Sequence, residues 1–118
     1  MQKTYLNFEQ GTIVIADILF SEQIGVKRRP VLVISNTAFN QLSDDMLVLK
    51  ITSADKKTEY DVNLKNEDLE EGKLKTNSFI MTDFIATIQK NLVTEGIGKI
   101  SDKKLYEVKQ KIKELFDL

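Results

Sequence analysis

Hydrophobic and polar positions divide the chain into apolar runs separated by polar connections. The longest runs are rich in β-branched residues and nearly continuous, which is typical of strands buried in a core. They cover Gly11–Phe20, Arg29–Asn36, Met46–Ser53 and Ser78–Ile88. The first contains a lone charged residue, Asp17, and we expect an interruption in the last near Thr82 and Asp83.

Two shorter segments predict further strands. Residues 58–64 alternate apolar and polar positions, which indicates a half-buried edge or hairpin strand. Residues 92–101 form a short strand that carries Gly96 and Gly98. The connection over residues 36–45 has room for a short helical turn, and residues 65–77 are charged and turn-rich, with Gly72 expected in a turn.

The C-terminal segment predicts an amphipathic helix. Ser101 is placed to cap its N-terminus, and Leu105, Val108, Ile112 and Leu115 form one apolar stripe. We expect this stripe to pack on the core, and part of it can also serve a dimer interface. Several short strands followed by one helix predict a mainly β protein with helices (α+β), a small twisted sheet or barrel closed by the helix.

Length and composition favour an intracellular globular protein. A chain of 118 residues fits a single domain, residues 1–118, and no apolar stretch reaches the ~20 residues of a transmembrane helix. The first residues lack the apolar core of a secretory signal, and there is no cysteine. We therefore expect a cytoplasmic protein without membrane association.

Charge and residue usage restrict the chemistry. A net charge of −1 argues against coating nucleic acid by bulk electrostatics, so any phosphate binding has to be local. With no histidine, acid–base chemistry must use carboxylates, Lys, Tyr, Arg, hydroxyls or groups of the substrate. The absence of histidine and cysteine also argues against zinc.

Three consecutive cations, Lys27, Arg28 and Arg29, stand directly before Pro30. One interpretation is a solvated loop with no task. The other is that the loop is anchored between two strands and stiffened by Pro30, which we expect to be the first strand residue. An arginine on a rigid base presents a permanently charged planar fork suited to phosphate and to charge that develops in phosphoryl transfer.

Two further groups are candidates for the same chemistry. Thr52 and Ser53 end an apolar strand with two hydroxyls, which are either turn formers or donors to a phosphate oxygen if they face the arginines. Asp83 is either a turn residue or the partner of a cation. No pair of carboxylates has the spacing of a metal site, and there is no glycine-rich phosphate loop.

The order of these motifs resembles the MazF/PemK-type toxins of type II toxin–antitoxin modules. The resemblance extends from Gly11 to Leu118, and its most specific part is "KRRPVLVISN" followed by "ITS" at the end of the next strand. It implies a small SH3-like β-barrel with appended helices, usually a homodimer. It further implies an endoribonuclease without metal or cofactor that cleaves single-stranded RNA at short sequences and is neutralised by a cognate antitoxin.

In the chemistry that the resemblance implies, the 2′-hydroxyl of the RNA attacks the adjacent phosphate and leaves a 2′,3′-cyclic phosphate. The family's catalytic arginine matches Arg29, which would stabilise charge and take part in proton transfer. The family's hydroxyl matches Thr52, which would hold a non-bridging oxygen. The RNA-contacting positions would be Phe20, Ser21, Lys27, Arg28, Asn36, Ser53 and Asp83, with Phe20 stacking on a base.

The chain departs from the family at two arginine positions, which hold Ala86 and Met81. These departures keep an alternative open: a non-enzymatic interaction protein on the same barrel, either an inhibitor of a protein target such as gyrase or a degenerate, regulatory toxin. The C-terminal "KELFDL" has no tryptophan, which argues against the gyrase version. A structural barrel with an uncommitted basic loop is the third interpretation.

Overall fold

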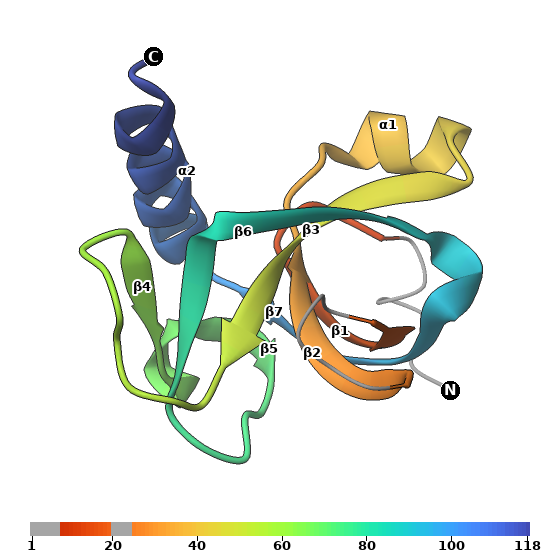
Figure 1. Ribbon diagram of the computed structural model, residues 1–118, viewed down its shortest axis with the longest axis horizontal. Helices are drawn as coiled ribbons and strands as arrows, with labels where there is room; N and C mark the ends of the chain where they lie inside the picture. Colours follow the sequence, from red (N-terminus) through yellow and green to blue (C-terminus); the bar gives the residue numbers. More distant parts are fainter. Residues whose placement is uncertain (1–7, 20–24) are drawn as a thin grey trace.

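The computed structural model of the chain describes residues 8–19 and 25–118 (Figure 1). Its strands are β1 (Thr12–Ile18), β2 (Lys27–Val33), β3 (Asp45–Thr52), β4 (Asp61–Leu64), β5 (Leu69–Gly72), β6 (Ser78–Gln89) and β7 (Val93–Ile100). Its helices are α1 (Thr37–Leu42), α2 (Asp102–Phe116) and two 3-10 turns, η2 (Asn66–Asp68) and η3 (Lys90–Leu92).

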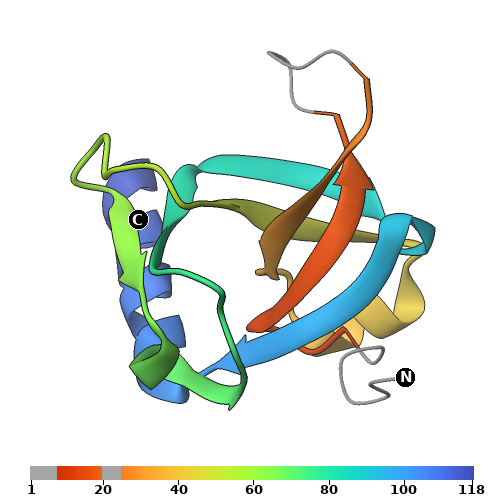
Figure 2. The same cartoon turned by 90° about the horizontal axis from the view of Figure 1, so that it is seen from below.

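The strands form one antiparallel sheet in the order β4-β6-β3-β2-β1-β7-β5. The sheet is strongly curled, so that Figure 2 shows its strands surrounding an interior, while α2 lies along one side. This arrangement confirms the predicted mainly β barrel with a C-terminal helix. Among the described residues, no helix is long and apolar enough to cross a membrane.

Both faces of the central strands are buried. Along β1, Ile13 belongs to one apolar cluster, whereas Val14 and Ala16 belong to a second cluster on the other face. Successive strand residues point to opposite faces, so a strand covered on both sides must be apolar at almost every position. This two-sided burial explains the nearly continuous apolar runs of the sequence.

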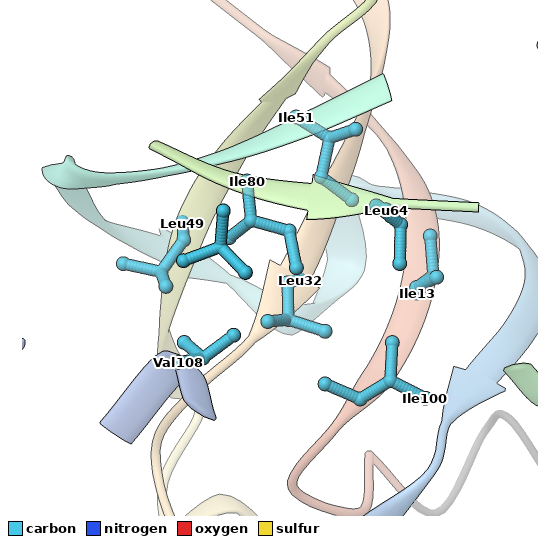
Figure 3. Packing of buried hydrophobic residues seen from close by; sticks show 9 residues of the cluster. Ile13, Leu32, Leu49, Ile51, Leu64, Ile80, Ile100 and Val108 are labelled. Atoms are coloured by element: carbon cyan, nitrogen blue, oxygen red, sulfur yellow. The ribbon is translucent and has the colours of Figure 1, made fainter. Parts of the chain in front are cut away.

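The first cluster is closed by α2. Figure 3 shows Val108 of this helix beside side chains from the central strands, including Leu32 and Leu49. The N-terminus of α2 is capped as predicted, because Ser101 Oγ accepts a hydrogen bond from the Lys104 backbone N–H at 3.1 Å. Of the predicted stripe, Leu105, Val108 and Ile112 all pack on this cluster, and Leu115 is half-buried.

The segment 65–77 differs from the prediction, because it contains the short edge strand β5 as well as turns. β5 pairs with β7, and Gly72 permits their close approach. A Cβ atom on Gly72 would lie 2.0 Å from the Ile97 carbonyl oxygen, and the residue has a φ of +85°. Tertiary pairing with β7 therefore makes a strand of a charged sequence that lacks the usual strand composition.

The prediction of an interruption near Thr82 and Asp83 is wrong for the strand β6 itself, and only its pairing with β3 is irregular there. Opposite β3, the register jumps from Met81 to Ile85, while β6 itself runs without a break. Thr82 lies within the irregular stretch and is buried, and its hydroxyl donates to the Tyr60 carbonyl at 2.8 Å. Asp83 follows it and is exposed.

Candidate functional site

The strands β2 and β3 are paired over a short distance and then separate. Their pairing covers three residue pairs, from Val31–Lys50 to Val33–Val48. Before Val31, β2 continues along β1, and after Lys50, β3 continues along β6, so the two strands leave an opening between them. Figure 1 shows this divergence at the C-terminal end of β3.

Arg29 and Thr52 stand on opposite sides of this opening. If the pairing of β2 with β3 continued by two residues, its register would set Arg29 opposite Thr52. Both residues then point to the same face of the sheet, because side chains alternate with a period of two. Both line one cavity of about 920 Å³. The structure thus brings together the two residues that the family resemblance matches to catalytic positions.

The lining of the cavity combines apolar and polar side chains. It comes from β1, β2, β7, the end of β3 with the residue after it, the segment between β5 and β6, and the first residue of β6. The apolar contributors are Ile15, Pro30, Ile51, Leu74 and Ile97, and the polar and charged ones are Arg29, Lys50, Thr52, Ser53, Lys73, Lys75, Thr76, Ser78 and Glu95.

The charge of the cavity is positive. Arg29, Lys50, Lys73 and Lys75 contribute four cations, against the single carboxylate of Glu95. Like charges gathered around a low-dielectric hollow raise the local potential and attract an anion even where the whole molecule is nearly neutral. The cavity is thus a local concentration of positive charge on a molecule whose net charge is −1.

Arg29 is held by its position in β2. The structure corrects the prediction of a loop: the three cations are the first residues of the strand, and Pro30 is its fourth residue. Proline is tolerated because pairing with β3 begins only at Val31, which leaves one edge of β2 open at Pro30. Arg29 Nη1 donates to the Arg28 carbonyl at 3.3 Å, which ties the guanidinium to the backbone.

Thr52 is both a turn former and a free donor. Its Oγ1 accepts a hydrogen bond from the Ala54 backbone N–H at 3.1 Å, which fixes the oxygen at the end of β3. A hydroxyl that accepts from the backbone keeps its own proton for donation. The adjacent Ser53 is exposed and lines the same cavity. The turn-forming interpretation is therefore confirmed for Thr52, and donation to a phosphate oxygen stays a prediction.

The other two cations of the cluster lie outside the cavity lining. Lys27 and Arg28 are exposed, and Arg28 Nε donates to Asp17 Oδ1 at 3.1 Å. Asp17 stands directly opposite Arg28 in the β1–β2 pairing. The lone acid of the first apolar run and the middle cation of the basic cluster are therefore partners of each other.

The remaining predicted contacts are dispersed. Asn36 caps α1, because its Oδ1 accepts from the Phe39 backbone N–H at 2.7 Å, and neither Asn36 nor Asp83 lines the cavity. Phe20 and Ser21 lie outside the described residues. The RNA contacts of these residues stay predictions.

Sequence reasoning missed several residues of the cavity. Lys50 is one of them, and its Nζ also lies 5.1 Å from the centroid of the Phe84 ring. The signal for Lys73 and Lys75 was their alternation with Leu74, which packs on the core between them. The backbone N–H of Leu74 donates to Asn66 Oδ1 at 2.8 Å, so this basic segment is fixed in place. Thr76, Ser78 and Glu95 had no local signal.

Metal ligands do not gather anywhere in the part of the chain that the structure describes. Within residues 8–19 and 25–118, no three histidine, cysteine or acidic side chains form a group that could hold a metal ion.

Comparison with known proteins places this chain in a family. Residues 9–116 match the family described as "PemK-like, MazF-like toxin of type II toxin-antitoxin system". The chain therefore belongs to the PemK/MazF toxin family. It is also 33% identical over 106 residues to a protein named endoribonuclease MazF from Staphylococcus saprophyticus, covering 87% of this chain and 86% of that relative.

Solved structures share the fold. An endoribonuclease in complex with its cognate antitoxin from a mycobacterial species superposes with a TM-score of 0.77 at 16% identity, covering 93% of this chain and 95% of the other. A MazE–MazF complex from Deinococcus radiodurans gives a TM-score of 0.75 at 23% identity, covering 93% and 96%. At these identities the likeness concerns the fold.

Proposed function

We propose that this protein is an endoribonuclease toxin that cleaves single-stranded RNA inside the cavity between β2 and β3. The observation that carries the proposal is that Arg29 and Thr52 line one cationic hollow, at positions that the register of β2 with β3 would set opposite each other if the pairing continued. A relative that is 33% identical bears the name endoribonuclease MazF, which supports the same activity.

In the proposed reaction, the 2′-hydroxyl oxygen of the substrate attacks the adjacent phosphorus, and the bond from phosphorus to the 5′-oxygen of the next nucleotide breaks. The products are a 2′,3′-cyclic phosphate and a 5′-hydroxyl. Arg29 stabilises the charge that develops on the phosphate oxygens, because its guanidinium is permanently charged and held against the strand. The Thr52 hydroxyl donates a hydrogen bond to a non-bridging oxygen of the phosphate.

The rest of the RNA binds along both sides of the cavity. Lys73 and Lys75 supply positive charge on one wall, and Lys27 and Arg28 extend the basic surface along the exposed half of β2. This distribution compensates for the two family arginines that the chain lacks. Ala86, one of these positions, is partly buried against the second apolar cluster.

The biological setting follows the same family. Solved relatives include an endoribonuclease in complex with its cognate antitoxin and a MazE–MazF complex. We propose that this protein is likewise neutralised by a cognate antitoxin, that it acts as a homodimer, and that it acts in the cytoplasm on cellular RNA.

The activity is tested with the purified protein and a long single-stranded RNA in the presence of EDTA. We expect cleavage at short sequence motifs, with 2′,3′-cyclic phosphate ends detected by mass spectrometry. A substrate with 2′-deoxyribose at the cleaved nucleotide should resist, because it lacks the attacking hydroxyl. Intact RNA after prolonged incubation, or cleavage of the deoxy-substituted substrate at the same position, would contradict the proposal.

A further inference from the structure

The cavity is lined by side chains from both faces of the sheet. Arg29 lies two residues before Val31 of the second apolar cluster, so both point to one face of β2. Pro30 points to the other face, together with Ile15, its partner in the β1–β2 pairing. Glu95 stands opposite Ile15 in the β1–β7 pairing and therefore shares this second face. Since Arg29 and these three residues line one cavity, the cavity extends across the opening between β2 and β3.

The two faces give the cavity two chemically different parts. The face of Arg29 contributes charged and hydroxyl side chains. The opposite face, which is that of the first apolar cluster, contributes the half-buried apolar side chains of Ile15, Pro30 and Ile97 and the exposed side chain of Glu95. A nucleotide has the same division, because its phosphate is charged while its base is a flat ring system with a polar edge. A phosphate at Arg29 therefore leaves the apolar part of the cavity to a base.

Glu95 is the single carboxylate among the described residues that line the cavity. No ion pair with another described residue neutralises it, and its negative charge repels the phosphates of a bound RNA. A carboxylate accepts hydrogen bonds and donates none. The donors that RNA offers are base N–H groups and ribose hydroxyls, and the apolar surroundings of Glu95 suit a base better than a ribose. The carboxylate therefore fits a contact with the polar edge of a base, the edge by which single-stranded RNA is read.

We propose that Glu95 determines base specificity in this part of the cavity and selects guanine, an inference that rests on the proposed ribonuclease function. The two carboxylate oxygens match two adjacent donors of guanine, the ring N1–H and the 2-amino group. Adenine and cytosine present one amino group beside a ring nitrogen that repels a carboxylate, and uracil presents one N–H between two carbonyl oxygens. Ile15, Pro30 and Ile97 supply the apolar surface for the ring. Base recognition and phosphate stabilisation are thus divided between the two faces of the sheet.

The test measures the affinity of the purified protein for two short 2′-deoxy oligouridines by fluorescence anisotropy. One carries uracil throughout, the other has guanine at its central position, and neither can be cleaved. We expect the wild type to bind the guanine-containing oligonucleotide about 10- to 100-fold more tightly, the usual discrimination of a bidentate base contact, and Glu95→Ala to bind both within about 3-fold. Glu67→Ala is the matched control and should keep the wild-type preference, because Glu67 is exposed in η2 and does not line the cavity.

The all-uracil oligonucleotide separates base recognition from a structural role. Glu95→Ala should bind it as tightly as the wild type or more tightly, because the substitution removes a repulsive charge. Sequencing of the cleaved RNA ends is a second measurement: the wild type should cut at motifs with one invariant guanine, and Glu95→Ala should lose that preference. Replacing this guanosine by inosine, which lacks the 2-amino group, should slow cleavage by the wild type about 10-fold and leave Glu95→Ala unaffected.

Three results would overturn the inference. They are equal binding of the two oligonucleotides by the wild type, a guanine preference that survives in Glu95→Ala, and an equal loss of affinity for both oligonucleotides in Glu95→Ala. Binding is measured without cleavage, so a wild type that binds these oligonucleotides with the expected preference but leaves RNA intact would contradict the proposed function instead.

Discussion

The two halves of β2 differ in almost every physical property although they belong to one short strand. Val31–Val33 are fully buried, all three pair with β3, and Val31 and Leu32 also pair with β1. Residues 27–30 carry the cation cluster, are exposed or half-buried, and pair with β1 alone. The buried half fixes the direction of the strand, and this direction determines where Arg29 lies in the open half. A charged group held in this way needs little reorganisation when charge develops on a substrate.

Leu32→Ala should have the largest effect on stability, because it removes a side chain from the buried half of β2. Leu32 is 0% exposed and belongs to the first apolar cluster. We expect a loss of about 2–5 kcal/mol in the free energy of unfolding, measured by urea denaturation. Leu42→Ala is the control, since Leu42 is 91% exposed and its truncation should cost less than about 0.5 kcal/mol. Equal losses in the two variants would contradict the division of β2.

Arg29→Ala changes the open half of β2 and should lower the activity without lowering the stability. We expect the cleavage rate to fall by roughly 10²-fold or more, because one transition-state donor is removed. The free energy of unfolding should change by less than about 0.5 kcal/mol, since the side chain is not part of the core. Arg29→Lys should recover little, because lysine keeps the charge but loses the planar fork. A variant that unfolds and loses activity together would contradict this separation.

Thr52 lies on the other side of the opening, and Thr52→Val should lower the cleavage rate less than Arg29→Ala. It removes one neutral donor, and we expect a fall of about 10-fold in the cleavage rate. Thr58→Val is a matched control, because Thr58 Oγ1 accepts from the Tyr60 N–H at 3.1 Å in the same kind of turn and lies outside the cavity lining. Rate measurements on both variants isolate the donor from the turn. Equal cleavage rates for the two variants would show that the Thr52 hydroxyl does not take part in the reaction.

Asp17→Asn should have the smallest effect. The substitution breaks the ion pair with Arg28, whose side chain is 71% exposed. Exposed ion pairs contribute about 0–1 kcal/mol, so the free energy of unfolding should fall by less than about 1 kcal/mol at low salt. The wild type and the variant should converge at high salt, where such pairs are screened. A large loss that persists at high salt would show that the open half of β2 has a structural role.

Local sequence pattern predicted the parts of the fold that are governed by local physics. The apolar runs predicted the central strands because burial on both faces leaves little room for polar residues, and Ser101 predicted the start of α2 through its capping side chain. Strand β5 was not predicted, because its stability comes from pairing with β7, where Gly72 allows the two strands to approach closely. No local pattern records that contact.

The site was predictable only in part for the same reason. Arg29 and Thr52 stood out as residue types at strand ends, but their juxtaposition depends on the register between β2 and β3. Glu95 could not be found at all from the sequence, because it reaches the cavity from β7, two strands from β2. The role of Asn36 as the N-cap of α1 could have been predicted, because asparagine is a preferred residue at helix N-caps.

The central claim is that Arg29 and Thr52 act on one phosphate across the opening between β2 and β3. A double-mutant cycle of Arg29→Ala and Thr52→Val, followed by single-turnover RNA cleavage, tests it most directly. If both side chains hold the same phosphate, the double variant should cleave at a rate within about 3-fold of Arg29→Ala alone, because groups that act as a unit are not additive. Rate losses that multiply in full would show that the two residues act independently and would contradict the account.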